Sequence, residues 1–154
     1  MNLFEFKKKE TKPDLLKKEN IRMNCKRAPK DEVILEVGKM LYETGYVDEN
    51  YPAAMLKREE TFSTIIGNGI ALPHGVEEAK KAVIHSGIAV MAFPEGTNWG
   101  EEDVKLVVGV AGVGEEHLMI LANIAEKLAT PEAVDLLIAG TADDVYRVFM
   151  GGDQ

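Results

Sequence analysis

The sequence predicts an α/β fold in which a mixed β-sheet is covered by helices on both faces. The chain is helix-rich at both ends, and segments rich in β-branched residues lie between them. A chain of 154 residues, 45% of them hydrophobic, can bury one core but is too short for two. We therefore expect a tail over residues 1–15 and a single domain over residues 16–154.

Charge is distributed unevenly along the chain. Residues 1–30 contain ten Lys or Arg and four Asp or Glu, whereas the whole chain carries a net charge of −8. An acidic body repels phosphate backbones, so we expect no nucleic-acid partner and instead a partner protein with a basic face. The tail is typical of a solvated segment, with contact to an anionic membrane as the alternative.

Composition also predicts a cytoplasmic location. The single cysteine, Cys25, excludes an internal disulfide and fits a reducing compartment. Its simplest interpretation is a small buried apolar residue. The apolar stretch at residues 1–6 is too short for a secretory signal, and no apolar run reaches membrane-spanning length.

Two helices are predicted in the first third of the chain. Residues 30–44 carry apolar side chains at helical spacing, and Gly45 follows as a stop signal. Asp48 can cap a second helix that runs to about Glu60, with Pro52 tolerated in its first turn.

The second predicted helix places Tyr51, Met55 and Arg58 on one stripe. Arg58 therefore continues an apolar face, although a cation near a helix C-terminus is stabilising without any further role. The adjacent Glu59 and Glu60 are expected to be solvated.

Residues 66–75 form the stretch that the rest of the chain is expected to support. Two glycines around an asparagine allow a tight turn, residues 70–72 are typical of a buried strand, and Pro73 is expected to end its ladder. His74 then lies between that proline and a glycine that leaves the imidazole accessible. This arrangement can present a nucleophile, although a lone histidine more often only satisfies local hydrogen bonds.

Common cofactor and hydrolase motifs are missing from the sequence. Gly67 and Gly69 begin a G-x-G-x-x-G pattern, but Leu72 occupies its last glycine position. The sequence contains no G-x-x-x-x-G-K-[ST], no H-E-x-x-H and no G-x-S-x-G. We therefore expect no bound cofactor.

The central part of the chain is predicted to form a helical turn and two strands. The turn covers residues 76–82, the strands cover residues 83–93 and 104–109, and residues 94–100 are typical of a loop. His85 opens the first of these strands, and we interpret it as structural.

Three helices are predicted at the C-terminal end. The first runs from about Glu115 to Ala129 and places His117 in its first turn, on the buried side. The other two begin at Thr130-Pro131 and at Thr141, where Asp144 can complete a capping box.

Several motifs give the chain a resemblance to a known family. They are E-N-I (19–21), Y-V-x-x-x-Y (46–51), the K-R-E that contains Arg58, G-N-G-I-A-L-P-H-G (67–75), P-E-G (94–96) and V-V-G-V-A-G-x-G-x-E-H-L (107–118). On these motifs the chain resembles the mannitol-type enzyme IIA component of the bacterial phosphoenolpyruvate-dependent sugar phosphotransferase system. The resemblance covers about residues 19–150, and the combination of motifs favours mannitol-type over fructose-type relatives.

The resemblance implies a three-layer α/β sandwich and a phosphohistidine intermediate. It implies that His74 is phosphorylated, that His117 is a second active-site histidine and that Arg58 is the basic residue beside them. The implied donor is the carrier HPr, and the implied acceptor is a cysteine of enzyme IIB or of the IICB permease, which would be the only link to the membrane. The implied process is uptake of mannitol or a related hexitol, without a metal or other cofactor. Trp99 and Pro29 depart from the family pattern, and we expect both to lie outside the chemistry.

Two alternative functions remain at this point. A regulatory relative would accept the phosphoryl group but signal through its partners. A metal-binding hydrolase would use His74, His117 and a carboxylate, although their spacing is not typical of a zinc site.

Overall fold

A computed structural model describes residues 14–151 and contains a mixed five-stranded sheet with the strand order β1-β4-β5-β3-β2. The strands are β1 (Ile21–Arg22), β2 (Ile65–Gly67), β3 (Ile70–Ala71), β4 (Gly87–Asn98) and β5 (Asp103–Ala111). β4 and β5 pair antiparallel at the centre, β1 pairs parallel with β4, β3 pairs parallel with β5, and β2 pairs antiparallel with β3. The mixed sheet that the sequence predicts is therefore confirmed.

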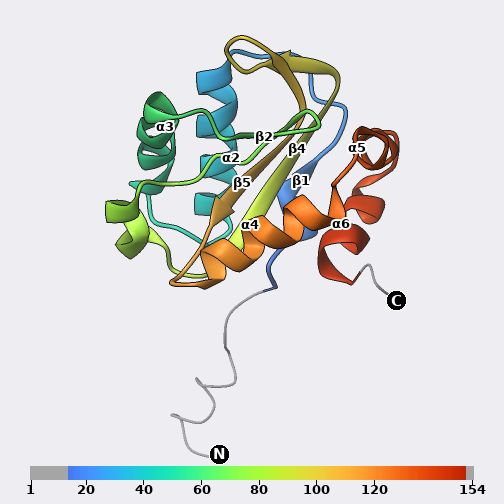
Figure 1. The fold of residues 1–154 in the computed structure, drawn as a ribbon. Helices are drawn as coiled ribbons and strands as arrows, with labels where there is room; N and C mark the ends of the chain where they lie inside the picture. The colour runs from blue at the N-terminus through green and yellow to red at the C-terminus, as the bar shows by residue number, and fades with distance from the viewer. Residues whose placement is uncertain (1–13, 152–154) are drawn as a thin grey trace, which may run out of the picture.

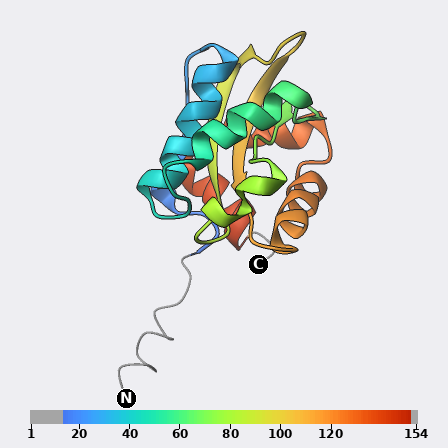
Figure 2. The ribbon, with the colours of Figure 1, turned by 90° about the vertical axis from the view of Figure 1, so that its left-hand side faces the viewer.

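Helices lie on both faces of this sheet (Figure 1). The helices α2 (Lys30–Glu43) and α3 (Tyr51–Thr61) cover one face, which is turned toward the viewer in Figure 2. The other face carries α4 (Glu116–Lys127), α5 (Pro131–Ile138) and α6 (Ala142–Met150), and the short helices η1 (Lys18–Asn20) and η2 (Glu77–Ala82) lie in connections. None of the helices in residues 14–151 combines the length and apolarity needed to cross a membrane.

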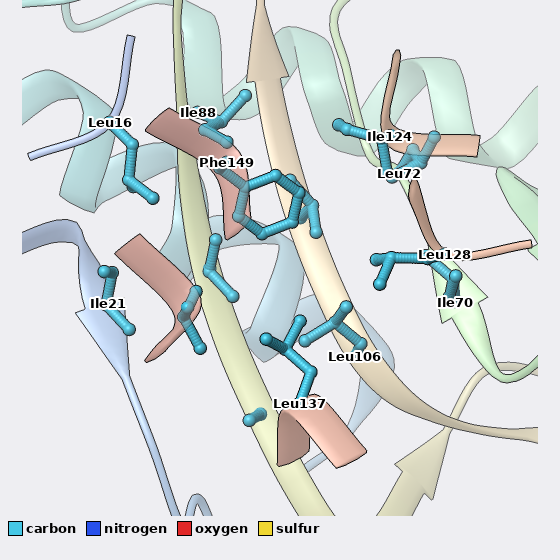
Figure 3. Packing of buried hydrophobic residues seen from close by; sticks show 14 of the residues in the cluster. Leu16, Ile21, Ile70, Leu72, Ile88, Leu106, Ile124, Leu128, Leu137 and Phe149 are labelled. Carbon is cyan, nitrogen blue, oxygen red and sulfur yellow. The ribbon is translucent and has the colours of Figure 1, made fainter. Parts of the chain in front are cut away.

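Each face of the sheet buries its own apolar cluster. Along β5, Leu106 and Val108 pack with the cluster under α4, α5 and α6, and the intervening Val107 packs with the cluster under α2 and α3. Successive side chains of a strand point to opposite faces, so a strand covered on both sides is apolar throughout. Figure 3 shows the first cluster, in which Phe149 and Leu137 lie over the central strands.

The prediction that residues 94–100 form a loop is wrong. β4 continues to Asn98, and Thr97 pairs with Val104 after an irregularity in the register that begins at Ala92. Pro94 lies inside this irregularity, where the ladder does not need its missing N–H, so a residue typical of turns does not end the strand. The strand also begins at Gly87 instead of residue 83, which leaves His85 ahead of it.

Helix starts were predicted with mixed success. The Thr141 capping box is confirmed, since its hydroxyl accepts from Asp144 N–H while the Asp144 carboxylate accepts from Thr141 N–H. Thr130 likewise accepts from a backbone N–H at the start of α5. The prediction that Asp48 caps α3 is wrong, because Asn50 holds the cap position and the Asp48 carboxylate accepts from Asn50 N–H ahead of the helix.

The N-terminal segment is partly outside the described residues. Of the predicted tail over residues 1–15, only Asp14 and Leu15 are described, and Leu16 beside them is fully buried. Cys25 is only partly buried, so its interpretation as a core residue is wrong; burial still raises the pKa of its thiol.

Candidate active site

His74 follows β3 and lies beside β5. It forms an isolated parallel bridge with Val110, and Val110 N–H donates to the carbonyl of Pro73 at 2.9 Å. The expectation that Pro73 ends the ladder is therefore wrong. Proline lacks only the N–H donor, and its carbonyl still pairs with the neighbouring strand.

The ring of His74 has a defined orientation and proton position. Its Nδ1 lies 2.8 Å from the carbonyl oxygen of Leu72. Because a carbonyl can only accept, Nδ1 carries the proton, and in the neutral ring the lone pair lies on Nε2. Burial lowers the pKa of His74 below its usual 6.5, against the effect of the Leu72 hydrogen bond, and the charge of Arg58 lowers the pKa further. The ring is therefore neutral at pH 7, with Nε2 as a potential nucleophile.

Tyr51 holds the turn that follows His74. Its buried hydroxyl donates to Val110 O and accepts from Gly75 N–H, both at 2.9 Å. A Cβ on Gly75 would lie 2.6 Å from the Tyr51 ring, so only glycine allows this approach. Burial raises the pKa of Tyr51 to about 12, and the phenol stays protonated as a donor. The P-H-G turn is thus fixed between α3 and β5.

His117 contacts His74 from the face of the sheet that carries α4, opposite to the face covered by α2 and α3. The centroids of the two imidazole rings are 4.9 Å apart and their planes are tilted by 55°. His117 is partly buried in the first turn of α4, as predicted, and packs against the backbone of Gly112. Ser86 fixes the preceding loop, since its hydroxyl donates to Glu116 and accepts from Val113 N–H.

Arg58 lies near the C-terminus of α3 and is partly buried. Its guanidinium donates to the carbonyl of Phe62 at 3.0 Å and lies 5.7 Å from the centroid of the Phe62 ring. This is the favourable position of a cation at a helix C-terminus. The same charge also acts on the pKa of His74, so Arg58 belongs to the surroundings of that ring as well.

The expectation that Glu59 is solvated is wrong, whereas Glu60 is exposed as expected. Glu59 is 5% exposed, and its carboxylate accepts from Thr64 N–H, the Thr64 hydroxyl and Trp99 Nε1–H. The signal was present in the sequence, because residues 51, 55 and 59 recur every four positions and all three are buried. A charged residue on an apolar stripe indicates a buried partner rather than a solvated face.

These groups can carry out nucleophilic chemistry on an anionic group. A neutral Nε2 can attack an electrophile, and a second imidazole and a guanidinium can stabilise negative charge on it. Among the residues whose side chains the structure describes, no three His, Cys, Asp or Glu lie close enough to hold a metal ion.

Comparisons with known proteins agree with this fold. The mannitol-specific phosphotransferase enzyme IIA component of Bacillus subtilis (strain 168) is 46% identical over 137 residues, which cover 88% of this chain and 96% of that protein. The crystal structure of IIA mannitol from Escherichia coli has a TM-score of 0.79 and 35% identity, covering 85% of this chain and 96% of that one.

A further neighbour is the Escherichia coli complex of enzyme IIAMTL with phosphorylated enzyme IIBMTL. It has a TM-score of 0.81 and 34% identity and covers 88% of this chain and 98% of the matching chain. The likeness to mannitol-type enzyme IIA expected from the motifs is confirmed. Residues 14–151 match the family described as phosphoenolpyruvate-dependent sugar phosphotransferase system, EIIA 2, and the chain belongs to that family.

Proposed function

We propose that the chain is a cytoplasmic phosphoryl carrier that accepts a phosphoryl group on Nε2 of His74 from HPr and passes it to a cysteine of enzyme IIB. The observation that carries the proposal is the 2.8 Å contact of His74 Nδ1 with Leu72 O, which leaves the Nε2 lone pair available beside His117 and Arg58. The mannitol-specific relatives support mannitol or a related hexitol as the sugar taken up.

The transfer proceeds by in-line displacement. The Nε2 lone pair of His74 forms a bond to phosphorus while the bond to the donor imidazole breaks, and its electron pair returns to the donor. In the second step a thiolate of enzyme IIB attacks, and the electron pair returns to Nε2. His117 donates a hydrogen bond to phosphoryl oxygens, and Arg58 offsets their charge.

Exposed apolar side chains near these residues support docking of other proteins. Phe62 follows α3 and contacts Arg58, and Leu118 and Met119 follow His117 in α4; all three are at least 66% exposed. Apolar side chains grouped beside a reactive centre are typical of a protein-binding surface. The partner named in the related complex is a phosphorylated enzyme IIB, which fits such a surface.

Three variants test the assignment with HPr as donor. His74→Ala removes the acceptor and abolishes phosphorylation. Arg58→Ala slows transfer by on the order of 10³-fold, the effect of arginine contacts in nucleotide enzymes. His117→Ala slows transfer but leaves the acceptor in place. A His74→Ala protein that still gains a phosphoryl group from HPr would refute the proposal.

The regulatory alternative predicts a different fate for the phosphoprotein. Phosphorylated protein is mixed with enzyme IIB and permease, and formation of sugar phosphate is followed. A carrier loses its phosphoryl group to enzyme IIB within the turnover of transport. A regulator retains it and instead changes its affinity for a protein outside the transport system.

A further inference from the structure

The buried carboxylate of Glu59 collects donors from three parts of the fold. Its Oε2 accepts from Thr64 N–H and Trp99 Nε1–H, both at 2.9 Å, and its Oε1 accepts from the Thr64 hydroxyl at 2.7 Å. The ammonium of Lys30, at the start of α2, lies 3.4 Å from Oε2. Burying a carboxylate costs several kcal/mol unless it is fully hydrogen-bonded, as it is here.

One of these donors leads by hydrogen bonds to the ring of His74. Thr64, which donates to Glu59, accepts from Leu72 N–H through its own carbonyl at 3.0 Å. Leu72 in turn accepts from His74 Nδ1 at 2.8 Å. Three consecutive hydrogen bonds therefore join a buried carboxylate to the nitrogen that sets the tautomer of His74.

The same carboxylate also fixes the surroundings of Arg58, its neighbour in sequence. Arg58 donates to the carbonyl of Phe62. Phe62 lies in the segment between Glu59 and Thr64, whose two ends are joined by the hydrogen bond from Thr64 N–H to the Glu59 carboxylate. The segment from α3 to β2 is thus closed by Glu59 into a short hydrogen-bonded loop. Movement of Thr64 would move Phe62 and the guanidinium bound to it.

We infer that Glu59 is a positioning residue for phosphoryl transfer, which holds Thr64 so that Leu72 keeps the His74 ring oriented with Nε2 free. The inference rests on the proposed function of His74. Glu59 acts by the length and acceptor geometry of its side chain, since the chain of bonds needs an oxygen that reaches Thr64 N–H. Misplacement of a reacting group by about 1 Å can cost roughly 10²-fold in rate.

The test compares two variants of Glu59 that separate reach from charge. Glu59→Gln keeps the length and an acceptor oxygen, so we expect transfer from HPr within about twofold of the parent protein. Glu59→Asp keeps the charge but is one methylene shorter, so we expect a rate at least about 10-fold lower per folded molecule. The folded fraction is measured by urea unfolding.

Trp99→Phe is the matched control. It removes a donor to the same carboxylate, on the branch that leads away from His74. We expect it to lower the urea midpoint of unfolding while the transfer rate per folded molecule stays unchanged. A rate loss as large as that of Glu59→Asp would mean that any disturbance of this core slows transfer, and the inference would be wrong.

The ¹⁵N shifts of the His74 ring give a readout that needs no phosphoryl transfer. The parent protein, Glu59→Gln and Trp99→Phe are expected to show the Nδ1–H tautomer, and Glu59→Asp a mixture with Nε2–H. A parent protein with the Nδ1–H tautomer but no phosphorylation refutes the proposed function, and a tautomer mixture in Glu59→Asp would still show that Glu59 orients the His74 ring. An unchanged tautomer and rate in Glu59→Asp, or a slow Glu59→Gln beside a normal Glu59→Asp, overturns the inference.

Discussion

At the scale of single residues, the proposed chemistry depends on a His74 ring that stays neutral. Burial and then the charge of Arg58 lower its pKa, so the folded protein binds this proton less readily than the unfolded chain does. The contribution of His74 to the free energy of unfolding is therefore complete above pH 6.5 and decreases as the pH falls below that value. The same titration would remove the lone pair of the proposed nucleophile.

The first prediction follows from the lowered pKa of His74. The rate of phosphoryl acceptance falls on acidification with a midpoint below pH 6.5, because burial lowers the pKa of His74 below the usual value of histidine. Arg58→Gln moves the fall to higher pH, since it removes a cation that lowers the pKa. The ring protons of His74, followed by NMR over the same range, check both statements. A midpoint above 6.5 in the parent protein would contradict them.

A second prediction concerns the hydroxyl of Tyr51. Tyr51→Phe leaves Gly75 N–H and Val110 O without this partner, so the free energy of unfolding falls by about 1–3 kcal/mol. Because Gly75 adjoins His74, phosphoryl acceptance per folded molecule also falls. Tyr46→Phe is the comparison, since the Tyr46 hydroxyl donates to Asp14 O, at the N-terminal end of the described chain. Equal rates for the two variants would show that the Tyr51 hydroxyl does not position the turn.

Sequence patterns at this scale predict an accessible imidazole at position 74 but do not predict the groups that hold it. The proline and glycine around His74 indicate an accessible ring, whereas nothing local indicates that Leu72 O accepts from it. Composition alone places Glu59 in solvent, because charged residues usually lie there. Its buried partners come from Thr64 and Trp99, and the Trp99 contact spans 40 positions that a local pattern cannot relate.

At the scale of elements, the helices and strands were largely predictable, and their ends less so. The Thr141 capping box has a local sequence signature and was found where expected. The continuation of β4 past Pro94 depends on pairing with β5, because Thr97 and Asn98 rejoin the ladder only against Val104 and Asp103. Tertiary pairing of this kind overrides turn propensity.

The third prediction concerns the start of α4. A Cβ on Gly112 would lie 2.5 Å from the Cα and Cβ of His117, so Gly112→Ala displaces His117 and with it the first turn of α4. We expect slower phosphoryl transfer. We also expect a smaller ring-current shift of the His117 ring protons by the neighbouring His74 ring.

Thr141→Ala serves as the control for a destabilised helix far from the two histidines. It removes the cap of α6 and lowers stability by about 1 kcal/mol, with no change in transfer rate per folded molecule. If Gly112→Ala behaved like Thr141→Ala, the contact of Gly112 with His117 would have no role in the chemistry.

At the scale of the whole molecule, the site joins parts that are distant in sequence. Arg58 comes from α3 and His117 from α4, which cover opposite faces of the sheet, and His74 comes from the end of β3 within the sheet. Hydrophobic periodicity predicts the helices and strands but not which of their ends meet. The resemblance to enzyme IIA supplied that expectation, and the structure brings the two rings to 4.9 Å.

The fourth prediction uses the net charge of −8. An acidic carrier attracts a donor with a basic face, and salt screens this attraction with a Debye length of about 10 Å at 0.1 M. The second-order rate of transfer from HPr therefore falls as ionic strength rises from roughly 0.05 to 0.5 M, while the rate at saturating donor stays constant. Rapid-quench kinetics at several donor concentrations separates the second-order rate from the rate at saturating donor. A second-order rate that is independent of salt would contradict electrostatic steering.

The most direct test of the account is the location of the phosphoryl group. The protein is incubated with phosphoenolpyruvate, enzyme I and HPr, its intact mass is measured, and the modified nitrogen is identified by ³¹P and ¹⁵N NMR of the imidazoles. We predict the mass of one added phosphoryl group, bound to Nε2 of His74, and no addition in His74→Ala. A phosphoryl group on Nδ1, on another residue or on the His74→Ala protein would contradict the account.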